Sequence, residues 1–222
     1  MFISRMAING ARRQSRFLLG SPQAMHAAVL ASFPPGTLTE GDAGRVLWRI
    51  DKEPSRATWL YVVSPGQPDM THLIEQAGWP TQAAWETRDY LPFLGRIRTG
   101  QQWAFRLVGN PVHSVNLESG ESKRLGHITA VQQAQWLRQR GENSGFALTQ
   151  TEAGADDLVV SEREKRSFRR ESAQVTLSTA RFDGRLEVRD ASELRHALTH
   201  GIGRAKGYGC GLLTLVPVRS DG

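Results

Sequence analysis

The chain has little of what several classes of protein require. It contains one cysteine in 222 residues, which excludes a disulfide framework and a cysteine-rich zinc site. No apolar run approaches the roughly 18 residues that a membrane span needs, and the first residues lack the charged and apolar regions of a signal peptide. The sequence therefore predicts a cytoplasmic protein that has no membrane partner.

Acidic residues are absent from the first 39 positions, where Arg5, Arg12, Arg13 and Arg16 stand. Over the whole chain 28 Lys and Arg oppose 22 Asp and Glu, so the formal net charge is +6. A second basic cluster consists of Arg163, Lys165, Arg166, Arg169 and Arg170. Such clusters are either solvated surface or contact sites for the phosphates of a nucleic acid.

Apolar periodicity in the first half of the chain predicts alternating strands and helices. Ser21 followed by Pro22 has the form of an N-cap and a first helical residue, and this helix ends before Pro34. A second helix begins after Pro68 and ends at Gly78. The predicted strands cover residues 2–8, 46–50, 58–63 and 84–90. The order β-α-β-β-α-β is that of a ferredoxin-like unit.

The second half predicts the same order. Thr129 and Asp190, the latter with Glu193 three residues on, have the form of N-caps, and Gly201 ends the last helix. The predicted strands cover residues 103–108, 146–148, 158–160, 175–180, 186–188 and 212–218. We therefore expect an α+β protein of two tandem ferredoxin-like (RRM-like) βαββαβ domains, residues 1–92 and 93–222.

Five glycines stand within residues 201–211. The predicted order of helix, glycines and strand is the reverse of a dinucleotide fingerprint, and no Lys-Ser or Lys-Thr pair completes a phosphate-binding loop of the NTPase type. A single turn needs only one or two glycines. The excess favours close packing of backbone or contact with phosphates, and Arg204 and Lys206 add positive charge.

Four segments in the same order resemble one family. They are FRLVGNP at residues 105–111, AQWL at 134–137 followed by Gly145-Phe146, FDGRLEV at 182–188 and GIGRAKGYGCGLLTLVP at 201–217. Together they resemble the CasE family, the CRISPR RNA endoribonucleases of type I-E (Cascade) systems. The resemblance covers nearly the whole chain.

The resemblance implies a fold and an activity. Members of the family consist of two ferredoxin-like domains and bind the stem-loop of each repeat in a precursor transcript. They cut at the 3′ base of the stem without metal or cofactor, because a 2′-hydroxyl attacks its own phosphate and leaves a 2′,3′-cyclic phosphate and a 5′-hydroxyl. They then stay on the product with the other subunits of a surveillance complex.

Histidine suits the proton transfers of such a reaction, and the chain has six. His72, His196 and His200 fall opposite the apolar faces of their helices and are expected to be solvated, whereas His113 and His127 fall in predicted loops. His26 lies at the margin of an apolar stripe, where a histidine at a packing interface is the commoner case. The resemblance, however, places the catalytic histidine of the family at His26.

The remaining site residues follow from charge and from the resemblance. Gln23 stands where some relatives have an assisting tyrosine, and glutamine cannot exchange protons. The predicted RNA contacts are Arg12, Arg13 and Arg16 near the reacting phosphate, the Arg163–Arg170 cluster on a basic hairpin or loop, and Gly203, Arg204, Lys206 and Gly207 in the glycine-rich segment.

Two other functions compete with a metal-independent nuclease. A non-catalytic RNA-binding subunit of the same type of complex would use the same basic and glycine-rich segments. A metal-dependent nuclease needs clustered carboxylates. The absence of acidic residues from the first 39 positions and the lack of a DxD grouping disfavour this function.

Overall fold

The computed structural model describes residues 1–36, 44–53, 57–81, 84–116, 122–170 and 173–218. The chain forms two compact units. The first comprises Met1–Arg96, Leu198–Gly201 and Lys206–Leu212, and the second comprises Ile97–Ala197, Ile202–Ala205 and Leu213–Gly222. The domain boundary expected after residue 92 remains a prediction. No helix in the described ranges is long and apolar enough to cross a membrane.

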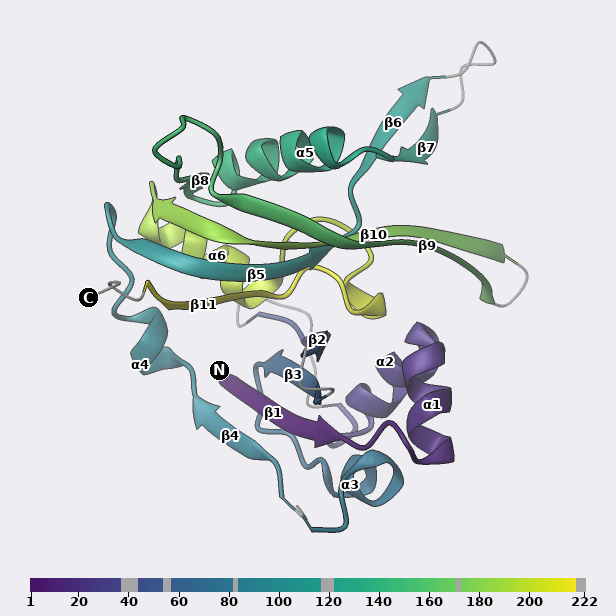
Figure 1. The fold of residues 1–222 in the computed structure, drawn as a ribbon. Helices are drawn as coiled ribbons and strands as arrows, with labels where there is room; N and C mark the ends of the chain where they lie inside the picture. The colour runs from purple at the N-terminus through teal and green to yellow at the C-terminus, as the bar shows by residue number, and fades with distance from the viewer. Residues whose placement is uncertain (37–43, 54–56, 82–83, 117–121, 171–172, 219–222) are drawn as a thin grey trace. The chain divides into compact units, whose positions relative to one another are not determined.

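One antiparallel sheet of four strands forms the first unit, in the order β2-β3-β1-β4 (Figure 1). The strands are β1 (Phe2–Ile8), β2 (Leu47–Lys52), β3 (Thr58–Ser64) and β4 (Glu86–Asp89). The helices are α1 (Arg13–Gly20), α2 (Pro22–Leu30), α3 (Thr71–Ala77) and the short α4 (Leu91–Leu94). This is the strand order of a ferredoxin-like domain.

The core of the first unit joins one face of this sheet to the helices. Met6 of β1 and Val62 of β3 belong to the same buried cluster as Met25 and Val29 of α2 and Leu73 of α3. Burying such side chains stabilises the fold by about 1.5–3 kcal/mol each. The core therefore fixes α2, which carries His26, against the sheet.

Helix α1 was not predicted. It has eight residues, of which only Ser15 and Leu18 are buried, and no side chain caps its beginning. It is joined to α3 by a hydrogen bond from the Ser15 hydroxyl to the Ala77 carbonyl at 3.2 Å, and Leu18 packs into the core cluster. So short and polar a helix leaves little apolar periodicity in the sequence.

The second unit repeats the fold. Its strands β5 (Gln102–Gly109), β8 (Phe146–Leu148), β10 (Ala173–Val188) and β11 (Leu213–Pro217) are ordered β11-β5-β10-β8, with helices α5 (Ala130–Glu142) and α6 (Ala191–His200) between them in sequence. Thr129 and Gln132 form a capping box, and the Asp190 carboxylate accepts from two backbone N–H groups at the start of α6. Both predicted caps and the tandem ferredoxin-like fold are confirmed.

Two hairpins extend this second unit. Strand β9 (Leu158–Arg170) pairs along β10, so the short strands predicted at 158–160, 175–180 and 186–188 are parts of one long ribbon (Figure 1). Strands β6 (Val112–Asn116) and β7 (Ser122–Gly126) form a separate pair that was not predicted. Strand β10 buries an apolar face, whereas no described side chain of β9 is fully buried. The hydrophobic pattern therefore marks parts of β10 and does not mark the full length of β9.

Candidate active site

His26 lies in the second turn of α2, and its position follows from the start of that helix. Ser21 caps α2 by accepting a hydrogen bond from the backbone N–H of Ala24, and Pro22 fills the first turn, as predicted. The half-buried imidazole meets β2, where the indole Nε1–H of Trp48 donates to its Nδ1 at 3.3 Å. His26 is therefore held by a hydrogen bond and not only by packing.

The glycine-rich segment passes beside both of these rings. A Cβ on Gly207, in the 3₁₀ turn η1 (Lys206–Tyr208), would lie 3.2 Å from Nε2 of His26. A Cβ on Gly209 would lie 2.7 Å from Cζ3 of Trp48. Two alternate glycines thus give the backbone room to pass against the two aromatic rings, which favours the packing interpretation of these glycines.

Replacing Gly209 with alanine is expected to destabilise the protein by about 2–4 kcal/mol. Its φ of +82° costs an L-residue roughly 1–2 kcal/mol, and the methyl group would overlap Trp48, which adds about 1–3 kcal/mol. Urea unfolding of the full chain measures the loss. Gly20→Ala is the matched control, since nothing lies within 4 Å of its Cβ position; equal midpoints for the two variants would contradict the packing seen at Gly209.

A buried ion pair anchors the end of this segment. Arg49, which is 2% exposed, donates from Nε to Oδ1 of Asp51 at 2.6 Å and from Nη2 to Oδ2 at 2.9 Å. Its Nη1 donates to the Leu212 carbonyl at 2.8 Å, and its guanidinium lies over the Tyr61 ring. Strand β2 therefore holds Trp48 beside His26 and, one residue later, the end of the glycine-rich segment.

The charged residues of the glycine-rich segment differ in exposure. Arg204 is exposed, whereas Lys206 is half-buried, and burial together with the nearby Arg45 guanidinium lowers the pKa of Lys206. Gly203, with φ of +76°, lies against the Trp136 ring. Cys210 is buried and unpaired, and burial raises the pKa of its thiol to about 12.

The three N-terminal arginines predicted to contact RNA lie on or beside α1. Arg12 donates to the carbonyls of Ile74 and Gly78 at 3.4 and 3.1 Å, so its guanidinium binds the C-terminal end of α3. Arg13 and Arg16 are exposed, and Arg16 also donates to the Ala11 carbonyl at 3.0 Å. Arg12 thus has a structural partner, whereas Arg13 and Arg16 face solvent.

The second basic cluster lies on β9, and of the two forms predicted for it, hairpin or loop, the structure has the hairpin. Lys165 and Arg166 are opposite Ser178 and Leu177 of β10, so their side chains point to opposite faces. Arg163 and Lys165 are exposed, and Arg166 pairs with Glu164 at 2.6 Å. Arg169 and Arg170 end the strand, and their side chains lie outside the described part of the structure. The cluster therefore presents charge on both faces.

The other histidines correct part of the expectation. His72 is half-buried, and its Nε2 lies 2.9 Å from the Ala28 carbonyl of α2. His200 is half-buried with Nδ1 2.9 Å from the Thr199 hydroxyl, while His196 is exposed as expected. The contact of His72 with another helix is not revealed by its position on its own helix.

Of the two histidines predicted in loops, His113 lies in β6, whereas His127 lies in the loop after β7, as expected. Their rings lie against each other in a tilted arrangement, with centroids 4.5 Å apart. Burial, and then His113, lower the pKa of His127. These two rings form a separate pair in the second unit.

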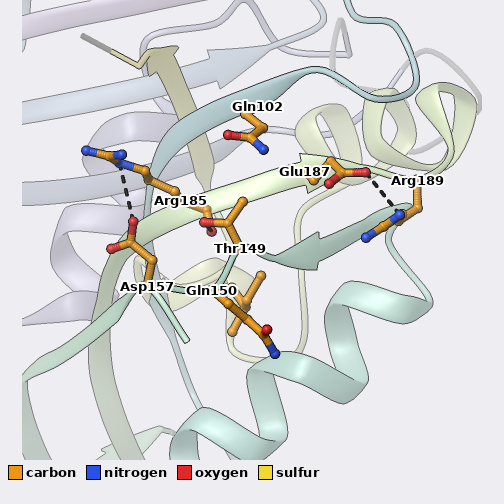
Figure 2. A pocket seen from close by; sticks show the side chains of 8 residues that line it. Gln102, Thr149, Gln150, Asp157, Arg185, Glu187 and Arg189 are labelled. Carbon is orange, nitrogen blue, oxygen red and sulfur yellow. Dashed lines mark hydrogen bonds and ion pairs between the residues drawn. The ribbon is translucent and has the colours of Figure 1, made fainter. Parts of the chain in front are cut away.

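A polar pocket of about 450 Å³ opens on the second unit, and none of the predicted site residues lines it (Figure 2). Ion pairs cross its wall between Asp157 and Arg185 at 3.3 Å and between Glu187 and Arg189 at 3.0 Å (Figure 2). Its charges are thus paired with each other.

The sequence analysis did not single out Trp48, which lies within the predicted strand 46–50. Trp48 is 3% exposed, but its N–H faces His26. Gln23 is exposed in the first turn of α2. Within the described ranges, no three His, Cys, Asp or Glu side chains gather as metal ligands. The candidate site therefore consists of the His26 imidazole, the indole N–H of Trp48 and the glycine turn beside them.

Comparison with known proteins places these features in a family. The model of the family described as CRISPR associated protein matches residues 1–217. The CRISPR-associated endoribonuclease Cse3 of Thermus thermophilus is 29% identical over 225 residues, which cover 98% of this chain and 100% of that protein. The CRISPR system Cascade subunit CasE of Escherichia coli is 28% identical over 187 residues, 78% of this chain and 89% of that one.

A solved structure agrees over the same length. The structure of Cse3 bound to a 19-nucleotide RNA matches with a TM-score of 0.80 at 26% identity, and the match covers 98% of this chain and 100% of that one. The chain therefore belongs to the CRISPR associated protein family, as a relative of Cse3 and CasE.

Proposed function

We propose that this protein is a metal-independent endoribonuclease that cuts CRISPR repeat hairpins in precursor transcripts. The observation that carries the proposal is the placement of His26 between the Trp48 indole and Gly207. An imidazole changes its protonation near neutral pH, as proton transfer at a phosphate requires. The similarity to Cse3, which is named an endoribonuclease and was solved with RNA, supports the same conclusion.

The proposed reaction is an internal transesterification. The 2′-hydroxyl of the nucleotide before the cut attacks the adjacent phosphorus, the bond to the 5′-oxygen breaks, and the products end in a 2′,3′-cyclic phosphate and a 5′-hydroxyl. His26 serves as the acid–base group at this phosphate, and cationic side chains stabilise the charge on its oxygens. Of the predicted cations, Lys206 is next in sequence to the glycine that contacts His26.

We assign RNA contact to the exposed basic residues. Arg13 and Arg16 on α1, and Arg163 and Lys165 on the ribbon, have the exposure and charge that phosphate contacts need. After the cut the protein stays on the guide RNA as a subunit of a surveillance complex, which is supported by the name of the Escherichia coli relative, a Cascade subunit. We place this complex in the cytoplasm, and the buried cysteine thiol of Cys210 is consistent with a reducing compartment.

Cleavage of a repeat stem-loop RNA in the presence of EDTA tests the proposed function. We expect one cut, with a 2′,3′-cyclic phosphate on the upstream product, and no cut when a single 2′-deoxynucleotide stands immediately before the same phosphate. The deoxy RNA is the matched control, because it keeps the stem and all phosphates. Cleavage of the deoxy RNA, or a requirement for divalent cation, would overturn the mechanism. Tight binding without any cut would identify a non-catalytic RNA-binding subunit instead.

A further inference from the structure

The hydrogen bond between Trp48 and His26 determines which ring nitrogen carries the proton. An indole Nε1–H can only donate, and it points at Nδ1 of His26 over 3.3 Å. Nδ1 must therefore offer its lone pair. In a neutral imidazole with an unprotonated Nδ1, the hydrogen is on Nε2. Nε2 is also the ring atom nearest to the Cβ position of Gly207.

Packing prevents the indole from turning away. Trp48 is 3% exposed and belongs to the same core cluster as Met25 and Val29, which flank His26 on α2. On its other side the six-membered ring lies against Gly209, where even a methyl group would overlap it. The donor is therefore fixed in place by the core of the first unit before any RNA binds.

We propose that Trp48 is a positioning residue for the cleavage reaction, which holds neutral His26 with its hydrogen on Nε2 so that this ring meets the RNA as a hydrogen-bond donor. This inference rests on the proposed function and narrows the acid–base role of the same histidine to hydrogen-bond donation from its neutral ring. The proton that the 2′-hydroxyl loses and the proton that the 5′-oxygen gains are then exchanged with water. Trp48 itself touches no reacting atom in this role and acts through His26.

The consequence for the chemistry is specific. A neutral imidazole N–H stabilises an oxygen on which negative charge develops, such as the departing 5′-oxygen or a non-bridging phosphate oxygen. For Nε2 to accept a proton instead, the hydrogen would first have to stand on Nδ1, where it would face the indole N–H. Two donors would then oppose each other, so the structure favours the donor role of Nε2.

The sharpest test replaces one atom. The benzothiophene analogue of tryptophan, incorporated at position 48 of the full chain, keeps the shape of the indole and lacks its N–H. At saturating protein we expect single-turnover cleavage of the repeat stem-loop RNA to slow by about 10- to 100-fold, while the Kd for the RNA and the unfolding temperature stay near those of the parent. The same analogue at Trp59, a half-buried residue of β3, is the control and is expected to leave the rate unchanged.

A second readout needs no RNA. In ¹⁵N-histidine-labelled protein at a pH where the ring is neutral, we expect His26 to show a protonated Nε2 and an unprotonated Nδ1, and the analogue at position 48 to give a mixture of both tautomers. A hydrogen on Nδ1 in the parent, or a parental rate in the analogue, would overturn the role of Trp48. If the parent protein does not cut the RNA, the proposed function fails, but the NMR result still decides whether Trp48 sets the tautomer. If His26→Ala cleaves normally, the catalytic role of His26 fails.

Discussion

Replacing His26 with alanine is expected to slow single-turnover cleavage of the repeat RNA by roughly 10²–10³-fold, the range that the loss of one hydrogen-bond donor to a developing oxyanion costs. The imidazole is half-buried at the end of the Trp48 hydrogen bond, and the alanine variant loses this group together with its hydrogen bond to Trp48 and its contact with Gly207. The RNA Kd is expected to stay near that of the parent, because the exposed cations on α1 and on the ribbon are unchanged.

Lys165→Ala provides the complementary control. Lys165 is exposed on β9 and is assigned to phosphate contact, so its loss is expected to raise the Kd while leaving the rate at saturating protein unchanged. The two variants separate chemistry from binding, since each changes one quantity. A His26→Ala protein that cuts as fast as the parent would remove His26 from the mechanism, and the cleavage would then have to be assigned to other residues.

Replacing Asp51 with alanine is expected to cost about 3–5 kcal/mol of folding free energy, the loss typical of breaking a buried ion pair from one side. Asp51 accepts two hydrogen bonds from the 2%-exposed Arg49, and the variant leaves that guanidinium buried without this carboxylate. Urea unfolding measures the effect. Cleavage is expected to fall with stability, because the same arginine holds the Leu212 carbonyl at the end of the glycine-rich segment.

Two companion variants decide whether burial is the cause. Glu86→Ala breaks the exposed Arg5–Glu86 pair, whose side chains are 44% and 53% exposed, and is expected to change stability little. Replacing both partners, Arg49→Met with Asp51→Leu, is expected to recover much of the loss, because no uncompensated charge remains buried. If Asp51→Ala unfolds like Glu86→Ala, the pair contributes nothing beyond a surface contact.

The elements that bury a periodic apolar face could be predicted from the sequence. The stripe of α2, with Ser21 and Pro22 at its start, and the capping residues Thr129 and Asp190 mark helices that the structure has at those places. Local chemistry suffices there, because a cap or a core face is encoded by residues that lie a few positions apart.

The elements that bury little were missed or shortened. Helix α1 has two buried residues, and no described side chain of β9 is fully buried, so neither leaves a clear period in the sequence. Each is held by hydrogen bonds to another segment, α1 by the bond from Ser15 to Ala77 and β9 by its pairing with β10. A single chain read locally contains no signal for such partners.

The candidate site divides in the same way. His26 could be singled out through the family resemblance, and the glycine-rich segment through its composition. The hydrogen bond between His26 and Trp48 joins α2 to β2 across 22 positions of the sequence. Both rings also lie against glycines near residue 208. Because burial is the ordinary fate of a tryptophan in a strand, its polar edge goes unnoticed until the structure shows what it faces.

The lone cysteine has a practical consequence. Because the Cys210 thiol is enclosed and its pKa is raised to about 12, it stays protonated and shielded from thiol-reactive reagents near neutral pH. We therefore expect the native cysteine not to react with a thiol-directed label in the folded protein. A fluorophore on one cysteine introduced at an exposed position of α1 or β9 would report RNA association and guide retention in real time, without first removing a native thiol.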